Sequence, residues 1–414
     1  MATPKSFPIK VVRCEPGFAK VAAAFKANFD DGDEIGSSLV IYYQGRKVVE
    51  LYGGYTDYDE STLNVVFSSG KTVESIVAAY LVSTGKLDYE ALVSAYWPEF
   101  GRYDKENVKV KDVLGHRGGL SWFDARHRPR VEDWQDLELM AHLIAEQPHN
   151  FAGITTYSYH AATRGWVLNE IFRRVSGNKS FGVLVNELFT PYGVEFYCGT
   201  PDSVESSKRI CDIVPWPYGR EGLKPQPAAK ELPASTVAIS ANVGRVTVGV
   251  TEMIPVVNTR VGRKGQAPSF NCVTNANGLA TIAAIMAGGG SLNGERLISV
   301  EAMKKADVEQ ELMTDVNSNF EIRLTNAGYA HWPEQTQPWF PNGKGSNRRA
   351  NWCWSGWMGL GGSVCQWDQN HNVSMGFVMN GAHPSAAGDR RTQRIRAALC
   401  DAVDALTVSP SQKL

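Results

Sequence analysis

The feature that most constrains this chain is a nine-residue stretch, Val65-Val66-Phe67-Ser68-Ser69-Gly70-Lys71-Thr72-Val73. An apolar, β-branched segment there runs into a turn of small residues. A helical pattern follows, because the apolar side chains of Ile76, Val77, Tyr80 and Leu81 share one stripe. Ser68 should therefore lie at or near the N-terminus of a helix, with Lys71 on the same face of that helix.

This spacing places an amine beside a hydroxyl. The N-terminus of a helix adds partial positive charge and free backbone N–H groups. A lysine that is desolvated in such a place loses its proton more readily, and a neutral lysine can activate a serine nucleophile. Taken alone, the pair is more often a helix N-cap serine followed by a solvated lysine. Other motifs have to decide between these two interpretations.

Composition and charge exclude several classes of partner. The 414 residues are 43% hydrophobic and 21% charged, with a formal net charge of −1, as in an ordinary globular protein with an ample core. No block of like charge points to nucleic acid or to an anionic membrane. The first 20 residues lack the apolar region of a signal peptide, and no apolar run is long enough to span a membrane. We expect a cytoplasmic protein.

Other chemistries find little support in the sequence. The seven cysteines form no Cys-x-x-Cys pair and the eight histidines form no His-Glu-x-x-His motif, so we expect free thiols, no metal site and no cofactor. A Gly-x-Ser-x-Gly elbow is absent, which argues against the α/β-hydrolase fold. The glycine-rich segment 288–294 lacks the Lys-Ser/Thr pair of a P-loop and is interpreted as a loop.

The order of the expected elements indicates the fold. A helix over residues 18–29 precedes two β-rich runs, 38–43 and 47–52, which the hairpin signal Gln44-Gly45-Arg46 separates. Residues 62–67 lead into the Ser68 turn. Further expected helices cover residues 73–84, 89–96, 133–146, 162–176, 181–188, 279–287, 300–309 and 391–406. Residues 361–367 and 373–379 should be strands, residues 236–250 strand or loop, and residues 330–356 a long ordered loop rich in tryptophan.

Strands thus come early and late, with helices between them. This order predicts an α+β fold in which an antiparallel sheet is flanked by terminal helices and carries an all-helical insertion. Residues 1–67 and about 270–414 would form the sheet lobe, and residues of about 68–269 a mainly helical lobe. The two lobes together would make one catalytic domain, with Ser68 between them.

Two further stretches carry possible site residues. The second stretch is Tyr157-Ser158-Tyr159-His160-Ala161-Ala162-Thr163-Arg164-Gly165-Trp166, where a tyrosine precedes a helix. The third is Ser355-Gly356-Trp357-Met358-Gly359-Leu360-Gly361-Gly362-Ser363, where glycines would let a substrate lie against the edge of a strand. Without the other motifs, Tyr159 would be interpreted as a buried core aromatic and Trp357 as an ordinary strand residue.

With these motifs in order, the chain resembles the serine β-lactamase-like superfamily. That superfamily includes class C β-lactamases, D-alanyl-D-alanine carboxypeptidases, family VIII carboxylesterases and acyltransferases. Its motifs are Ser-x-x-Lys, then Tyr-x-Asn, then Lys/His-Thr/Ser-Gly. Ser68 and Lys71 match the first motif, Tyr159 alone matches the second, and only Gly359 of the third is kept. The likeness extends over residues 30–405, nearly the whole chain.

The resemblance implies a role for each matching residue. Ser68 would be the acylated nucleophile, and Lys71 and Tyr159 would share the work of the general base. The backbone N–H groups of Ser68 and Leu360 would form the oxyanion hole. Around them, the substrate-binding positions would be Trp357, Gly359, His160 and Ala161.

Two departures from the family pattern bear on the substrate. Trp357 stands where a Lys or His helps to hold a substrate carboxylate, and Ala161 stands where an Asn binds a substrate amide. The resemblance implies a small-molecule ester or amide as the substrate. The two departures favour ester-like substrates, turned over by a carboxylesterase or acyltransferase. A β-lactamase or D-amino-acid peptidase is the alternative enzyme, with Arg348 or Arg349 as a candidate replacement for the missing cation. An inactive relative used for binding or assembly is the alternative of another class.

Overall fold

A seven-stranded antiparallel sheet forms the base of the molecule. The structure, a computed structural model, describes residues 7–54, 58–215, 250–317, 319–333, 351–383 and 389–407. The strand order of the sheet is β1-β3-β2-β15-β14-β13-β12. The strands are β1 (Ile9–Cys14), β2 (Ser37–Tyr43), β3 (Arg46–Gly53), β12 (Ala330–Pro333), β13 (Cys353–Met358), β14 (Val364–Asp368) and β15 (Val373–Met379). The early and late strands join where β2 pairs with β15 along seven residues of each.

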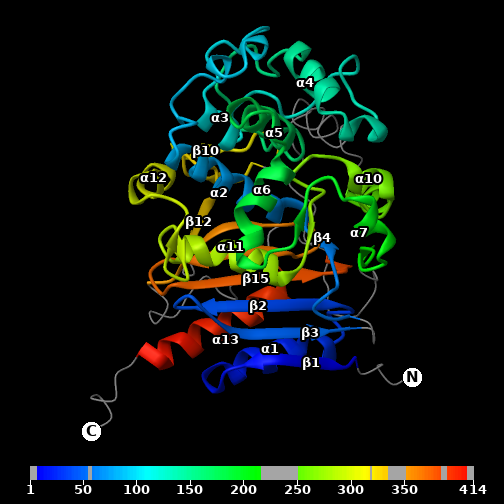
Figure 1. Ribbon diagram of the computed structural model, residues 1–414, viewed down its shortest axis with the longest axis vertical. Helices are drawn as coiled ribbons and strands as arrows, with labels where there is room; N and C mark the ends of the chain where they lie inside the picture. The colour runs from blue at the N-terminus through cyan, green and yellow to red at the C-terminus, as the bar shows by residue number, and fades with distance from the viewer. Residues whose placement is uncertain are drawn as a thin grey trace.

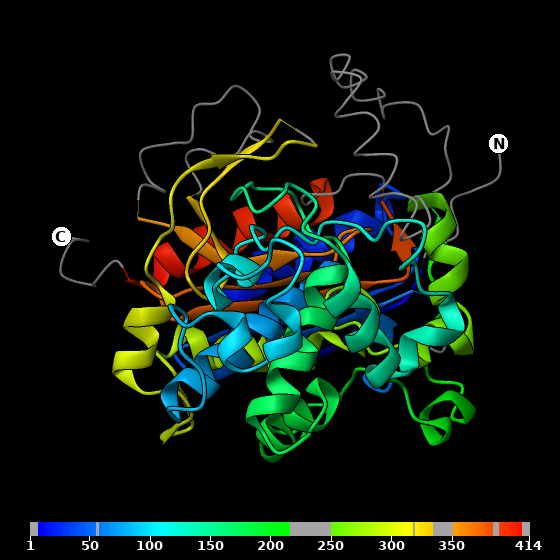
Figure 2. The same ribbon diagram turned by 90° about the horizontal axis from the view of Figure 1, so that it is seen from above.

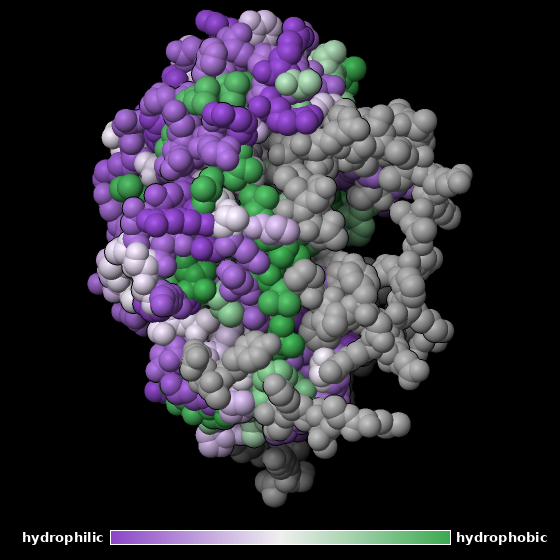
Figure 3. All heavy atoms as spheres, turned by 90° about the vertical axis from the view of Figure 1, so that its right-hand side faces the viewer, coloured by the Kyte–Doolittle hydropathy of each residue, from purple (hydrophilic) through white to green (hydrophobic). Residues whose placement is uncertain are grey.

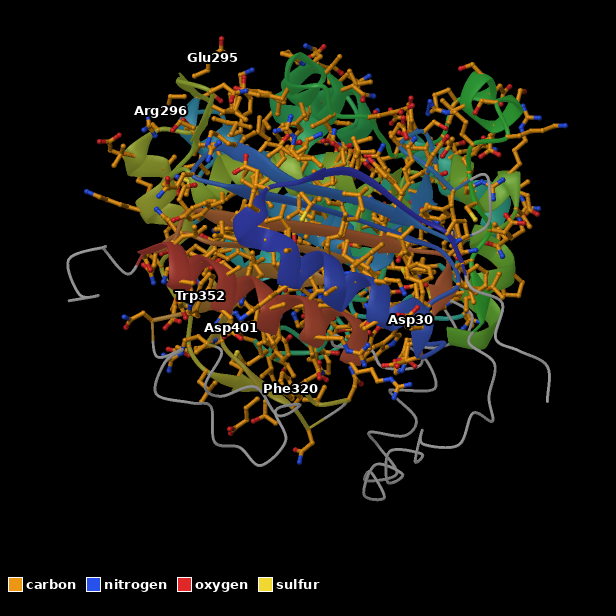
Figure 4. All side chains as sticks on the ribbon, turned by 90° about the horizontal axis from the view of Figure 1, so that it is seen from below. Asp30, Glu295, Arg296, Phe320, Trp352 and Asp401 are labelled. Atoms are coloured by element: carbon orange, nitrogen blue, oxygen red, sulfur yellow. The ribbon has the colours of Figure 1, made fainter. Side chains whose placement is uncertain are left out.

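Helices cover both faces of this sheet. The terminal helices α1 (Ala19–Asp30) and α13 (Arg390–Thr407) lie side by side on one face, as Figure 4 shows from below. Their apolar side chains share a core cluster with Leu39 and Ile41 of β2. Val40, which points the other way because strand side chains alternate, belongs to a second core with α11 (Ala276–Ala287). The sheet is therefore buried between two helical layers.

Most of the remaining helices lie above the sheet in Figure 1. In Figure 2 the green helices of residues 163–206 and the C-terminal helix α13 lie on opposite sides of the strands. The helices of this part are α2 (Gly70–Ser83), α3 (Val110–Leu114), α4 (Leu137–Glu146), α5 (Thr163–Val175), α6 (Phe181–Phe189), α7 (Asp202–Ser206), α9 (Val250–Val257) and α10 (Arg260–Lys264). Helix α12 (Val300–Ala306) packs against α2. The short 3₁₀ helices are η1 (Pro16–Phe18), η2 (Phe67–Ser69), η3 (Val93–Ala95), η4 (Pro98–Phe100), η5 (Val131–Gln135) and η6 (Thr190–Tyr192).

A small three-stranded sheet leads into the Ser68 turn. It consists of β4 (Asn64–Val65), β7 (Val273–Thr274) and β5 (Phe196–Tyr197), with β7 in the centre. The N–H of Val66 donates to the carbonyl oxygen of Cys272 at 3.0 Å, which anchors the residue two positions before Ser68. Two-residue strands complete the structure: β6 (Val214–Pro215) with β16 (Gly381–Ala382), β8 (Ser291–Leu292) with β9 (Glu295–Arg296), and β10 (Met313–Thr314) with β11 (Glu321–Ile322).

The predicted fold class is confirmed, and so are most expected elements. The hairpin of β2 and β3, the helix after Ser68 and the terminal helices lie where the sequence places them, within a few residues. The expected helix over residues 133–146 is split into η5 and α4 at Asp136, whose side chain caps α4 by accepting from the N–H of Leu139. Helix α12 ends at Ala306, three residues before the predicted end.

Two expectations about local structure are wrong. Residues 89–96 contain only the short η3, because the carbonyl oxygens of Tyr89 and Ala91 accept from the N–H groups of Lys111 and Val110 rather than from residues one helical turn later. Residues 330–356 are not one loop, since β12 and β13 at its ends pair in the main sheet. Pairing partners this far away in the sequence override local composition. Residues 334–350 and 236–249 lie outside the described residues.

The surface of the described residues is mixed in character. On the face drawn in Figure 3, hydrophilic side chains dominate and hydrophobic ones form smaller patches among them. Within the described ranges, no helix has both the length and the apolar character needed to cross a bilayer. The division into two lobes at residues 67 and 270 stays a prediction.

Candidate active site

Ser68 lies in η2, at the entry to α2. The residue before it, Phe67, has φ +46°, an unusual conformation for a bulky side chain and one of the kind that clusters at functional sites. Ser68 is partly exposed, whereas its neighbour Ser69 is buried. The Ser69 hydroxyl lies 2.9 Å from that of Ser363, which in turn donates to the carbonyl oxygen of Val66 at 2.6 Å. Ser69 therefore holds the turn together, and Ser68 is the hydroxyl left accessible.

The amine of Lys71 is fully buried beside Ser68. Its Nζ lies 3.1 Å from Ser68 Oγ, 2.8 Å from the carbonyl oxygen of Ala161 and 2.9 Å from that of Ser269. An ammonium group has three hydrogens for these three acceptors. A neutral amine can instead donate to the two carbonyls and direct its lone pair at the Ser68 hydroxyl.

Burial lowers the pKa of Lys71 below its usual value, because the charged form loses its hydration. Contacts with Tyr159 and with the carboxylate of Glu74 oppose this effect, while the charge of Arg164 adds to it. The ammonium also lies over the ring of Tyr159, 4.9 Å from its centroid, a favourable cation–π contact. The neutral amine is thus easier to reach than in water.

Tyr159 completes the group around Ser68. Its hydroxyl oxygen lies 2.8 Å from Ser68 Oγ. The indole N–H of Trp357 donates to the same Tyr159 oxygen at 3.4 Å, and the two rings stack with an interplanar angle of 11°. The backbone N–H of Tyr159 donates to the Asp315 carboxylate at 3.0 Å, which fixes the tyrosine from behind. Ser68 is therefore within hydrogen-bonding distance of both Lys71, three residues later in the sequence, and Tyr159, 91 residues away.

The turn after β13 approaches the start of α2 closely. A Cβ on Gly359 would lie 2.3 Å from the carbonyl oxygen of Val66 and 3.2 Å from the amide nitrogen of Ser69, so only glycine fits. The next residue, Leu360, is partly exposed. Within the described part of the chain, the N–H groups of Ser68 and Leu360 donate to no protein acceptor. An oxyanion hole requires such free N–H groups. Gly359 brings the neighbouring Leu360 to the residues that flank Ser68 in the sequence.

His160 and Ala161 do not present side chains to this group as a substrate-binding pair. The His160 ring is only 1% exposed, and its Nε2 accepts from the N–H of Leu120 at 3.0 Å. Its Nδ1 contacts the carbonyl oxygen of Ser158, so both ring nitrogens are occupied by backbone groups. Burial lowers the pKa of His160 to about 3, which keeps the ring neutral. Ala161 contributes through its carbonyl oxygen, which accepts from Lys71.

A buried ion pair behind Lys71 was not predicted from the sequence. Arg164 of α5 and Glu74 of α2 are fully buried, with 3.0 Å between Arg164 Nε and Glu74 Oε2. The Ser269 hydroxyl donates to Glu74 at 2.7 Å, while the Ser269 carbonyl accepts from Lys71. Glu74 follows Lys71 by three residues, a spacing that could have suggested a shared face. Nothing local could have identified Ser269, which is 198 residues from Lys71.

His116 supports Tyr159 from the neighbouring loop. Its ring centroid lies 4.7 Å from that of Tyr159, and its Nδ1 accepts from the N–H of His160 at 3.0 Å. Burial, reinforced by the charge of Arg164, holds the pKa of His116 well below its usual value. The imidazole is therefore a neutral packing partner rather than an acid or base.

A second serine, histidine and aspartate meet at the edge of the main sheet. Ser355 Oγ lies 2.8 Å from His331 Nδ1, and His331 Nε2 lies 3.2 Å from an Asp307 oxygen. Burial alone would lower the pKa of His331, but hydrogen bonds with Asp307 and Cys353 raise it to about 10. An imidazolium cannot accept the hydroxyl proton, so Ser355 is not activated at neutral pH.

The remaining expectations about the site concern metals and arginines. Among the described residues, no group of three or more His, Cys, Asp or Glu side chains is arranged to hold a metal ion. All seven cysteines are described and none forms a disulfide. Arg348 and Arg349 lie outside the described residues.

Several known proteins resemble this chain in sequence and in fold. A protein-family model described as Beta-lactamase matches residues 21–399. The "Esterase/beta-lactamase LipL" of Mycobacterium tuberculosis is 27% identical over 383 residues, covering 88% of this chain and 82% of that protein. The crystal structure of a family VIII carboxylesterase aligns with a TM-score of 0.81 at 27% identity, covering 95% of this chain and 100% of that one. A penicillin-binding protein homolog from Caulobacter crescentus aligns with a TM-score of 0.78 at 28% identity, with coverage of 95% and 100%.

The Glu74–Arg164 ion pair should influence the pKa of the Lys71 amine. Glu74→Gln removes a negative charge and should lower the Lys71 pKa, whereas Arg164→Met removes a positive charge and should raise it. Titration by ¹⁵N NMR of lysine-labelled protein measures the Lys71 pKa in both variants. The Lys71 signal is assigned by its loss in Lys71→Arg. The exposed Glu187→Gln is the matched control and should leave the pKa unchanged. Movement of the pKa in the same direction in both buried variants would contradict this electrostatic account.

Proposed function

Because this chain belongs to the β-lactamase family, we propose that it is a serine hydrolase that acts on ester-like substrates through an acyl-Ser68 intermediate. The observation that carries the proposal is the placement of one accessible hydroxyl between two proton-transfer groups. Ser68 Oγ lies 3.1 Å from the buried Lys71 amine and 2.8 Å from the Tyr159 hydroxyl. These distances allow the serine proton to leave as the oxygen attacks.

The first step is acylation of Ser68. The Ser68 oxygen attacks the substrate carbonyl, and its proton passes to the unit formed by Lys71 and Tyr159. Lys71 can accept a proton because its two other contacts are carbonyl oxygens, which are satisfied by the neutral amine as well as by the ammonium. The same unit then gives the proton to the leaving alcohol.

The negative charge of the tetrahedral intermediate forms on the former carbonyl oxygen. The N–H groups of Ser68 and Leu360 would donate to this oxygen, and their strongest interaction would come with the transition state rather than with the neutral substrate. Water, or another acyl acceptor, attacks the acyl-enzyme in the second step. The proton unit then acts in the reverse direction and releases Ser68.

The choice of an ester as substrate rests on Trp357 and Ala161. An anionic substrate group near Tyr159 would meet the Trp357 indole, where a cation stands in the family pattern. A buried carboxylate without a partner costs several kcal/mol, roughly, whereas a neutral acyl group gains ~1–3 kcal/mol by burial against an aromatic face. The similarity to the M. tuberculosis esterase/β-lactamase and to a family VIII carboxylesterase supports the same choice.

A β-lactamase or D-amino-acid peptidase is the second candidate, and the similarity to the penicillin-binding protein homolog favours it. Ester and amide substrates share the acyl-Ser68 step, so substrate preference alone separates these candidates. An inactive relative used for binding or assembly is the candidate of another class. It gives no reason for a buried amine next to an accessible serine.

The role of Ser68 is tested by a matched pair of substitutions. Ser68→Ala should reduce turnover of a nitrophenyl ester by several orders of magnitude, because the nucleophile is gone, while the thermal unfolding temperature stays close to that of the wild type. Ser69→Ala should lower stability more than it lowers turnover, since Ser69 bonds to Ser363. If Ser69→Ala abolished turnover and Ser68→Ala did not, the nucleophile would be wrongly assigned.

Lys71 and Tyr159 should behave as one proton-transfer unit. Lys71→Ala and Tyr159→Phe should each be severe, and the double variant should be little worse than either, because residues that act together are not additive. The measurement is kcat/KM of the two single variants and of the double variant with one nitrophenyl ester. Additive losses in log kcat/KM would refute a shared role.

Because Trp357 replaces the cation of the family pattern, the protein should prefer neutral substrates to anionic ones. A short neutral nitrophenyl ester should exceed a chromogenic cephalosporin in kcat/KM by several orders of magnitude, because only the cephalosporin carries a carboxylate. Trp357→Lys should narrow this ratio by assisting the anionic substrate. The matched control is Trp357→Phe, which keeps an aromatic face but supplies no charge and should leave the ratio wide. A wild-type preference for the cephalosporin would overturn the ester assignment in favour of the second candidate.

A further inference from the structure

The turn that carries Leu360 is held by its own backbone. The N–H of Gly359 donates to the carbonyl oxygen of Ser363 at 2.8 Å, and the N–H of Gly362 donates to the carbonyl oxygen of Gly359 at 3.1 Å. The Gly359 carbonyl and the Leu360 N–H belong to the same planar peptide group. The bond to Gly359 therefore also sets the direction of the Leu360 N–H.

A buried arginine, Arg391, donates a hydrogen bond to this turn. Arg391, near the start of α13, donates from Nη2 to the carbonyl oxygen of Gly361 at 2.5 Å. The N–H of His383 donates to the same oxygen at 3.0 Å. Gly362 contacts the group as well: its φ is +116°, and a Cβ there would lie 2.5 Å from Arg391 Nη2. The turn is thus fitted against the guanidinium on two successive residues.

All five guanidinium N–H groups of Arg391 find an acceptor. Nε and Nη2 donate to the two oxygens of Asp389 at 3.1 and 2.7 Å. Nη1 donates to Glu34 Oε2 and to the carbonyl oxygen of Gly381, both at 2.9 Å. The second Nη2 hydrogen reaches the Gly361 carbonyl described above. All five N–H groups of the planar guanidinium are thus occupied, and these hydrogen bonds hold Arg391 in place against the turn.

This ion cluster is buried, and burial of charged groups costs desolvation free energy. A role other than stability would explain why charged residues occupy these positions. Arg391 and Glu34 are 0% exposed and Asp389 is 2% exposed. Burial of charged groups is repaid only by complete pairing, and apolar replacements are often as stable or more so. The cluster joins four separate segments: the segment between α1 and β2, the strand β16, the start of α13 and the turn with Leu360.

We propose that Arg391, held by Asp389 and Glu34, is a positioning residue that keeps the Leu360 N–H directed at the oxyanion of the Ser68 reaction. The inference rests on the proposed function, because it requires a charge to develop on an acyl group at Ser68. Arg391 itself touches no reacting atom. It acts through the Gly361 carbonyl and the peptide that carries the Leu360 N–H.

The test separates positioning from mere stability. Arg391→Lys keeps the positive charge but loses the planar guanidinium and its five directed N–H groups. Asp389→Asn keeps a side chain of the same shape but removes the charge that holds Arg391. Both should lower kcat for a nitrophenyl ester about 10- to 100-fold with little change in KM, less than the complete loss of an oxyanion-hole donor. Affinity for an aryl boronic acid, whose tetrahedral adduct with Ser68 fills the oxyanion position, should fall in parallel with kcat.

The control is Arg396→Met, which removes another buried arginine of α13 that bonds to Gln366 of β14. It should lower the thermal unfolding temperature without changing kcat of the folded protein. Unchanged kcat and boronic acid affinity in folded Arg391→Lys and Asp389→Asn would overturn the inference, while Ser68-dependent turnover in the wild type would keep the proposed function intact. Turnover that does not depend on Ser68 would overturn both.

Discussion

The Lys71 amine is buried between the carbonyl oxygens of Ala161 and Ser269, and three parts of the chain meet at this one nitrogen. Removal of water from an amine favours its neutral form, and that form can take the proton of a neighbouring hydroxyl. The position of Ser68 on the first turn before α2 makes it that neighbour. Lys71 is buried from water, whereas Ser68 stays partly exposed.

Two buried ion clusters contact residues next to the site. Glu74 and Arg164 lie behind Lys71, and Arg391 with its two carboxylates lies behind the turn of Leu360. Removal of one partner from a buried pair leaves an uncompensated charge and costs about 3–5 kcal/mol. The first cluster therefore joins α2 to α5, and the second joins α13 to the β13–β14 turn. A reaction whose charge moves between Ser68 and a substrate oxygen benefits from such fixed surroundings.

The sequence was informative where spacing is local. The helix after Ser68, the β2–β3 hairpin and the terminal helices follow from periodicity and turn residues, and the resemblance pointed to Tyr159 as a partner of Ser68. Contacts between distant residues could not be read in this way. Ser269 is 198 residues from Lys71, and β12 and β13 were mistaken for a loop because their pairing partners are not adjacent. His160 was expected at the substrate, yet both its nitrogens serve backbone groups, which depends on how the Leu120 loop folds back.

The proposed mechanism requires Ser68 to be the activated nucleophile. The most direct measurement is peptide mass spectrometry of the native protein after exposure to a fluorophosphonate, which reacts with activated serine hydroxyls. We expect one covalent adduct, located on Ser68, that disappears in Lys71→Ala because the hydroxyl is no longer activated. An adduct on Ser69 or Ser355, or no adduct on the folded protein, would contradict it.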